Sequence, residues 1–153
     1  MKVPLPRLRS TEALARKMAR SLTGRELILL SGDLGAGKTT FVRYLAEALG
    51  VDPGWVSSPS FTLLQRYPAG GRGIVVSHVD LYRIAGAGDL ESLGLEDLLA
   101  SEDLVVVEWP EAAQDLWESS GRPIVEVHFH RDASGKREAH LTPDSFLRKG
   151  RVR

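Results

Sequence analysis

The stretch that decides the fold is Gly32-Asp33-Leu34-Gly35-Ala36-Gly37-Lys38-Thr39. Its spacing (a glycine, four residues, then Gly-Lys and a hydroxyl residue) is typical of a loop that binds phosphate groups. Glycine adopts backbone angles that let several N–H groups converge on one point, and a helix that begins at the lysine turns its positive end toward the same point. The stretch therefore predicts a phosphate-binding loop between a strand and a helix.

The last two residues of this loop carry its chemistry. The ammonium group of Lys38 can reach the β- and γ-phosphates of a nucleotide, and the hydroxyl of Thr39 can ligate Mg²⁺. We therefore expect ATP and Mg²⁺ as ligands, with Lys38 also taking part in catalysis. The expected nucleotide-binding residues in and around the loop are Thr11, Asp33, Leu34, Gly35, Ala36, Gly37, Lys38, Thr39 and Thr40.

The rest of the chain alternates between strand and helix patterns. The apolar run at 26–31 is typical of a parallel strand buried on both faces, and apolar residues recur at helical spacing over 11–22. Such alternation predicts an α/β fold, here a P-loop NTPase with a largely parallel central sheet flanked by helices. Further strand candidates lie at 61–67, 74–80 and 104–108, with a turn at 68–73, a helix at 39–49 and a C-terminal hairpin formed by 124–130 and 136–141.

Length and composition limit the class of protein. The 153 residues suit one domain, with about nine N-terminal and about eight C-terminal residues at its periphery. No apolar run approaches the roughly 20 residues that span a bilayer, the N-terminus lacks the apolar core of a signal peptide, and cysteine is absent. The formal net charge of zero does not indicate a broad basic face for nucleic acid. We expect a cytoplasmic enzyme that is monomeric alone and does not contact a membrane.

Two carboxylates follow buried-strand candidates and could complete the site. Asp80 ends the run at 74–79, and Glu108 ends the run at 104–107. The carboxyl ends of parallel strands meet at one edge of a sheet, so both should lie beside the phosphate loop. One would bind the metal and the other would orient or deprotonate the attacking water. Sequence patterns do not assign the two roles.

Other polar and aromatic residues near these motifs are ambiguous. The segment 57–62 could supply a hydroxyl, such as that of Ser60, that senses the γ-phosphate, or it could be a serine-rich turn before a strand. Trp109 directly follows Glu108 and is more often a packing residue than a ligand contact. The four histidines show no spacing typical of metal ligands, which favours structural roles.

Several stretches together resemble one family. The loop 32–41 is similar to the phosphate loop of the small bacterial ATPase family TsaE, also called YjeE. Segments 58–63, 78–83, 93–97 and 107–111 resemble further motifs of that family in the same order, from about residue 10 to about residue 140. One departure is Ser60, where the family usually has threonine. Serine keeps the hydroxyl but lacks the methyl group that restricts its rotamers.

The resemblance implies a function. Family members work with the TsaD and TsaB proteins to form N6-threonylcarbamoyladenosine at position 37 of tRNAs that read codons beginning with A. ATP binding and hydrolysis support turnover of that complex, and tRNA is met only through it. By motif, Thr39 and Glu108 would be the Mg²⁺ ligands and Asp80 would act in hydrolysis. Trp109 and Arg137 would lie near the nucleotide, although Lys136 displaces the glycine that usually precedes this arginine.

Three other classes share parts of this pattern. A small-molecule or nucleotide kinase has the same loop, but it usually needs an arginine-bearing lid over the γ-phosphate. The segment 66–72 is the one candidate for such a lid. A GTPase is disfavoured because no Asn-Lys-x-Asp segment is present to read guanine. A nucleotide-gated binding module with negligible turnover would differ from an ATPase only in its rate.

Overall fold

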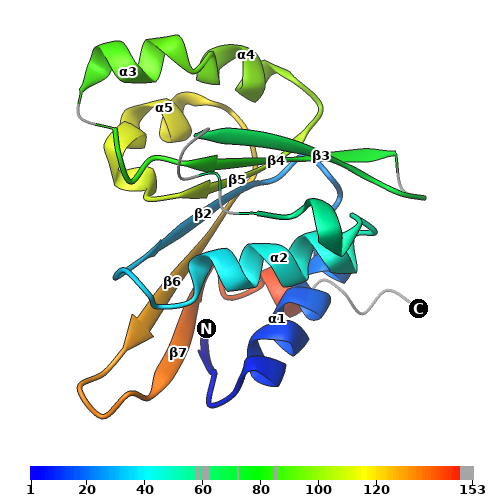
Figure 1. The fold of residues 1–153 in the computed structure, drawn as a ribbon, viewed down its shortest axis with the longest axis vertical. Coiled ribbons are helices and arrows are strands. Elements are labelled where there is room, and N and C mark those ends of the chain that lie inside the picture. The colour runs from blue at the N-terminus through cyan, green and yellow to red at the C-terminus, as the bar shows by residue number, and fades with distance from the viewer. Residues whose placement is uncertain (58, 60–62, 72, 85, 149–153) are drawn as a thin grey trace.

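The fold is built on one mixed sheet. The computed structural model describes residues 1–57, 59, 63–71, 73–84 and 86–148. Within them, a seven-stranded sheet runs in the order β1-β7-β6-β2-β5-β4-β3 (Figure 1). The strands are β1 (Lys2–Pro4), β2 (Leu27–Gly32), β3 (Leu64–Ala69), β4 (Ile74–Asp80), β5 (Leu104–Glu108), β6 (Ile124–Arg131) and β7 (Arg137–Thr142). Strand β1 has no counterpart among the strands expected from the sequence.

The four central strands are parallel. β2 pairs with β5 on one side and with β6 on the other, and β4 extends the parallel set beyond β5. Residues 27–30 of β2 are at most 3% exposed, as expected for a parallel strand covered on both faces. β3, β7 and β1 are added antiparallel at the two edges. The expected parallel sheet is confirmed for its centre, and the expected hairpin β6–β7 joins the same sheet.

Helices cover both faces of the sheet (Figure 1). The helices are α1 (Leu8–Ser21), α2 (Lys38–Ala48), α3 (Ala87–Ser92), α4 (Leu95–Ala100) and α5 (Gln114–Ser119), with 3₁₀ turns at Pro53–Trp55, Pro110–Ala113 and Phe146–Arg148. Alternate residues of β2 face opposite ways. Ile28 and Leu30 pack in one core with α1 and α2. Leu27 and Leu29 pack in a second core with α4 and α5.

The edges of the sheet differ from the sequence expectation. The first residues, which were expected at the periphery, form the edge strand β1, which pairs with β7, and Leu5 is only 3% exposed. Near the other end, Phe146 and Leu147 are buried, and residues 149–153 lie outside the described part of the chain. The turn expected at 68–73 begins later, because Pro68 belongs to β3. Proline is tolerated there because β3 is an edge strand.

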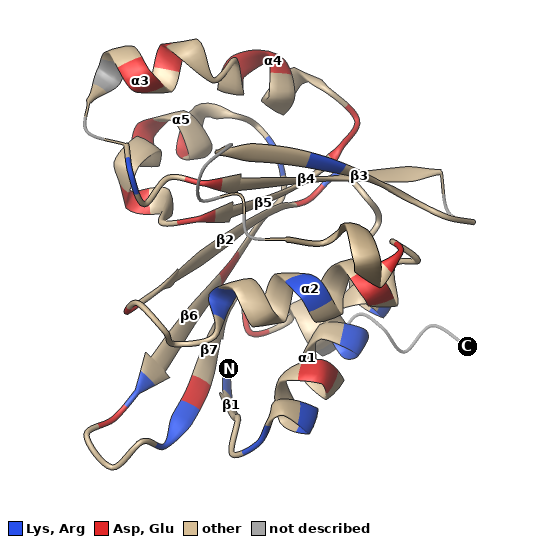
Figure 2. Cartoon of the chain, viewed as in Figure 1, with Lys and Arg blue, Asp and Glu red and all other residues tan. Residues whose placement is uncertain are grey.

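Charge is distributed unevenly over the two helical layers. No lysine, arginine or histidine occurs between Arg83 and Arg122, so α3, α4 and α5 carry carboxylates but no cations (Figure 2). Helices α1 and α2 carry most of their charge as arginine and lysine (Figure 2). The net charge of zero therefore combines an acidic layer with a more basic remainder. No helix in the described ranges is long and apolar enough to cross a bilayer.

Candidate functional site

The glycine-rich loop connects β2 to α2, as the sequence predicts. Gly32, the last residue of β2, has φ +125°, and a Cβ atom there would collide with the carbonyl oxygen of Phe129. Gly37 caps α2 in the left-handed region with φ +109° and ψ 14°. Both positions therefore require glycine, the first for space and conformation and the second for conformation. The helix that follows has its N-terminus, and hence its positive end, at Lys38.

A cavity of about 320 Å³ lies beside this loop, at the carboxyl edge of the parallel strands. It brings together residues that are far apart in the sequence, from the loop, from β4 and from the end of β5. This volume is at the lower end of the range for ligand pockets. The lining residues are Leu34, Gly35, Gly37, Lys38, Thr39, Thr40, Asp80, Tyr82, Glu108 and Trp109. Eight of the residues expected at the nucleotide site or in catalysis thus line one cavity, together with Glu108 and Tyr82.

Four other expected site residues do not line it. Asp33 and Ala36 belong to the loop and close a turn, in which the Ala36 N–H donates to the Asp33 carbonyl at 3.1 Å. Thr11 is buried in α1 at 8% exposure. Arg137 lines a separate cavity of about 370 Å³, together with Pro4 and His130. The geometry therefore supports a site formed by the loop and the two strand ends. The predicted contacts of Thr11 and Arg137 with the nucleotide stay predictions.

The two strand-end carboxylates are direct neighbours. Asp80 and Glu108 are paired across β4 and β5, and they are 4% and 2% exposed. The hydroxyl of Thr39 donates to Glu108, at 2.8 Å from Oε1 and 3.2 Å from Oε2. The backbone N–H of Tyr82 donates to Oδ1 of Asp80 at 2.9 Å. The expectation that both carboxylates meet beside the loop is correct.

Their environments push the two carboxyl groups in opposite directions. Burial raises the pKa of Asp80, the charge of Glu108 raises it further, and the hydrogen bond from Tyr82 offsets part of this. Burial also acts to raise the pKa of Glu108. Interactions with His78, the Thr39 hydroxyl and Asp80 outweigh burial there, so the net pKa of Glu108 is lowered. Glu108 is therefore the carboxyl of the pair that holds the negative charge more readily.

Lys38 is held against the loop and an aromatic ring. Its ammonium group donates to the carbonyls of Gly32 and Asp33, the second at 3.0 Å, and lies 4.0 Å from the centre of the Trp109 ring. Burial lowers the pKa of Lys38, and nearby carboxylates led by Glu108 offset part of that effect. The loop carbonyls hold the cation at the cavity, where phosphate oxygens could replace them.

Trp109 takes a conformation that is uncommon for a large residue. Its φ of 60° and ψ of 52° place it in the left-handed region, and its backbone N–H donates to the Leu30 carbonyl at 3.2 Å. Its ring lies over Lys38 and 5.0 Å from the ring of Tyr82. Sequence reasoning did not assign Tyr82 to the site, although it follows Asp80 by two residues. The backbone turn at Trp109 therefore directs the indole into the cavity.

The donor set fits a magnesium ion better than a softer metal. The hydroxyl of Thr39 and the carboxylates of Glu108 and Asp80 are all oxygen donors, which Mg²⁺ prefers. Among the described residues, no group of three histidine, cysteine or acidic side chains could hold a metal by itself. This suits a metal held by one or two carboxylates together with substrate phosphates. The expected contribution of Ser60 lies outside the described residues, as do Ser58, Phe61 and Thr62.

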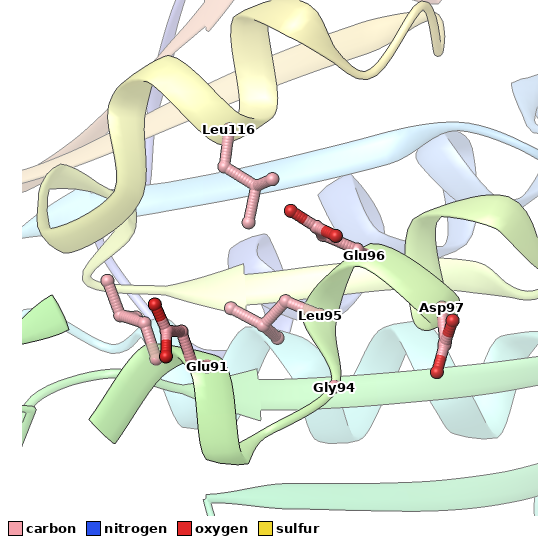
Figure 3. Close-up of a pocket in the computed structure, with 7 residues that line it drawn as sticks. Glu91, Gly94, Leu95, Glu96, Asp97 and Leu116 are labelled. Carbon is pink, nitrogen blue, oxygen red and sulfur yellow. The ribbon is translucent and has the colours of Figure 1, made fainter. Parts of the chain in front are cut away.

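The structure also contains a larger cavity away from the loop. It measures about 420 Å³ and lies among α3, α4 and α5 (Figure 3). Its walls combine Leu95 and Leu116 with the carboxylates of Glu91, Glu96 and Asp97 (Figure 3). It shares no lining residue with the loop cavity and has no basic group to meet a phosphate. Its size alone therefore does not make it the nucleotide site.

Comparisons with known proteins agree with one another. The family model of "Threonylcarbamoyl adenosine biosynthesis protein TsaE" matches residues 5–139. The tRNA threonylcarbamoyladenosine biosynthesis protein TsaE of Streptomyces coelicolor is 46% identical over 99 residues, which cover 64% of this chain and 66% of that protein, just under two thirds. Its namesake from Rickettsia typhi is 32% identical over 139 residues, 91% of this chain and 92% of that protein. The crystal structure of YdiB from Bacillus subtilis has a TM-score of 0.69 and 26% identity, covering 92% of this chain and 83% of that chain.

Proposed function

Because this chain belongs to the TsaE family of threonylcarbamoyl adenosine biosynthesis proteins, we propose that it is an ATPase that acts with TsaB and TsaD. Its ATP binding and hydrolysis would support turnover of the complex that forms N6-threonylcarbamoyladenosine at position 37 of tRNAs reading codons that begin with A. The observation that carries the ATPase part is the convergence of Lys38, Thr39, Asp80 and Glu108 in one cavity. Membership of the TsaE family supports the assignment to this tRNA modification pathway.

Lys38 and the loop would bind the triphosphate. The ammonium group already faces two carbonyl oxygens, and the more negative β- and γ-phosphate oxygens would replace them as acceptors. The N-terminus of α2 adds its N–H groups and the positive end of its dipole. The Trp109 ring limits the freedom of the lysine side chain. The groups that would bind ATP are thus held in place by the fold in the absence of the nucleotide.

Thr39 and Glu108 would hold the magnesium ion. When bound, Mg²⁺ would offset the negative charge that develops on the phosphate groups during hydrolysis. Thr39 and Glu108 are already in contact through the threonine hydroxyl, and Glu108 is the carboxyl with the lowered pKa. This separation of pKa values favours Glu108 as the ligand, in agreement with what the family resemblance implies.

Asp80 would serve the attacking water. A carboxylate with a raised pKa is the better proton acceptor of the pair, because general bases work best when their pKa is near the working pH. Asp80 lines the same cavity as the loop residues, and its Oδ1 accepts from the backbone N–H of Tyr82, which fixes the carboxyl at the cavity. Its role is to orient the water and accept its proton.

ATP hydrolysis by this chain would serve the partner complex. The cavity is edged by Leu34 and Tyr82, which are 72% and 52% exposed, so a partner that covers it could distinguish ATP from ADP. We expect slow hydrolysis by the isolated chain, tighter binding to TsaB–TsaD with ATP than with ADP, and no strong binding of tRNA without the complex. These expectations match a nucleotide switch.

Product analysis tests the proposal against its alternatives. Purified chain, with and without TsaB–TsaD, is incubated with Mg²⁺ and γ-labelled ATP, and pull-downs are repeated with ATP and with ADP. Free phosphate whose rate rises with the complex, together with a preference of the complex for the ATP state, supports the ATPase. Label on a small acceptor would favour the kinase instead. Nucleotide-dependent docking without turnover would favour the binding module.

A further inference from the structure

His78 is a buried imidazole without a hydrogen bond to the described part of the chain. It lies in β4 with 0% exposure, and neither ring nitrogen has a hydrogen-bond partner among the residues that the structure describes. Burying an unsatisfied polar group costs about 1–3 kcal/mol, so an apolar residue would fill this position at lower cost. A histidine at such a site calls for a role beyond packing.

The pairing of the strands places His78 directly beneath the two carboxylates. His78 precedes Asp80 by two residues and therefore faces the same side of β4. Its paired residue on β5 is Val106, which precedes Glu108 by two residues and packs in the core with α1 and α2. The imidazole is thus one layer deeper in the protein than the cavity, on the face that α2 covers.

The ring is directed at Glu108. Its Nε2 atom lies 3.5 Å from Oε1 of Glu108, which is just beyond the usual length of a charge-assisted hydrogen bond. A shift of about 0.6–0.8 Å would close that gap. The same Oε1 accepts from the Thr39 hydroxyl, which lines the cavity, and the Asp80 carboxyl also hydrogen-bonds to Glu108. A further donor from the strand below limits the rotation of a planar carboxylate more than these contacts do without it.

We propose that His78 is a positioning residue that holds the Glu108 carboxylate toward Thr39 and the cavity through a hydrogen bond from Nε2. The inference rests on the proposed role of Glu108 in holding the metal. His78 does not touch nucleotide or metal and acts only through Glu108. It matters most when the Thr39 hydroxyl is engaged by the metal, since the ring then remains as a donor to the carboxylate.

Two substitutions of His78 distinguish its role as a hydrogen-bond donor from its role in packing. His78→Leu keeps an apolar side chain of moderate size and removes the donor, whereas His78→Gln places an amide N–H close to the position of Nε2. The measurement is the Mg²⁺ concentration that gives half-maximal binding of a non-hydrolysable ATP analogue, with binding in EDTA and thermal unfolding as controls. We expect His78→Leu to raise this concentration about 10-fold or more, with little change in EDTA, and His78→Gln to stay near wild type. Equal Mg²⁺ requirements in wild type and His78→Leu, or equal losses in both variants, would overturn the proposal.

Nuclear magnetic resonance tests the contact without nucleotide or metal. In ¹⁵N-histidine-labelled protein, the His78 ring signal is identified by its loss in His78→Gln. It should shift in Glu108→Gln and stay unchanged in Glu96→Gln, whose carboxylate lines the separate cavity. An unshifted signal in Glu108→Gln would refute the contact even if His78→Leu fails to fold. A wild-type chain that binds no Mg²⁺ and ATP would instead refute the proposed function, and this spectrum would still decide the role of His78.

Discussion

Replacing Asp80 by asparagine should stabilise the metal-free protein while it removes most of the ATP hydrolysis. Asp80 and Glu108 are buried neighbours on adjacent strands. Burial raises the pKa of Asp80, and the charge of Glu108 acts in the same direction. Asparagine keeps the size of the side chain and an oxygen that accepts from the Tyr82 N–H, but it cannot ionise. The substitution therefore removes a strained charge and leaves the shape of the site unchanged.

The size of the gain follows from opposing effects. Two unit charges about 4 Å apart repel by about 4 kcal/mol at an effective dielectric constant of 20, which is an upper limit here. The wild type relieves much of this through a hydrogen bond between the two carboxyl groups and the attraction of Lys38 for Glu108. The Tyr82 bond becomes weaker by about 1 kcal/mol when its acceptor is neutral. We expect a net gain of about 1 kcal/mol, which raises Tm by roughly 2–4 °C in a chain of this length.

The expected gain in stability depends on pH, so thermal unfolding at several pH values tests it. Because the folded-state pKa of Asp80 is raised, its ionisation costs stability as the pH rises through that value. Below about pH 4 the carboxyl is protonated in both folded and unfolded chains, so asparagine gains nothing there. Thermal unfolding in EDTA should show the higher Tm at pH 7–8 and convergence with wild type near pH 4. Asp97→Asn, at an exposed acidic site, is the matched control and should change stability by less than about 0.5 kcal/mol.

The same variant should lose hydrolysis without losing ATP. If Asp80 accepts the proton of the attacking water, turnover should fall on the order of 10²-fold or more while the affinity for ATP with Mg²⁺ is retained. A lower Tm at neutral pH would refute the reasoning about the charge pair. Loss of Mg²⁺-dependent binding with hydrolysis of the remaining bound ATP intact would show that the roles of Asp80 and Glu108 are reversed.

Three further predictions concern the loop and the stability of the fold. Lys38→Met should weaken binding of ATP by tenfold or more, because the phosphate charge loses a desolvated partner; unchanged affinity by titration calorimetry would contradict this. Thr39→Val should raise the Mg²⁺ requirement and Thr39→Ser should largely restore it, and equal Mg²⁺ titrations for the two would count against the hydroxyl as a ligand. Glu26 is buried, and bonds from the Thr23 and Gly24 N–H groups outweigh burial and lower its pKa from 4.5. Glu26→Gln should therefore cost about 1–3 kcal/mol at neutral pH, a deficit that shrinks as the pH falls below that value; a deficit that persists in acid by denaturant unfolding would exclude the charge as its cause.

The local parts of the site could be predicted from the sequence alone. The loop from Gly32 to Thr39 is defined by backbone conformation, and residues a few positions apart determine that conformation without help from the rest of the chain. The buried strands Ile74–Asp80 and Leu104–Glu108 were predicted with the observed bounds, because continuous apolar runs are a strong signal. Placing both carboxylates beside the loop needed only the rule that parallel strands end at one edge.

Only the tertiary structure decided how those parts meet. That Asp80 faces Glu108 follows from β4 and β5 being adjacent, and strand order depends on long-range pairing that periodicity does not reveal. The same pairing turned His78, which sequence patterns classed as structural, toward Glu108. It also took the N-terminal residues into the sheet as β1 and separated Arg137 from the loop cavity. Local sequence determines which backbone conformations and chemical groups are present, whereas the burial of two strand faces by distant helices determines which groups become neighbours.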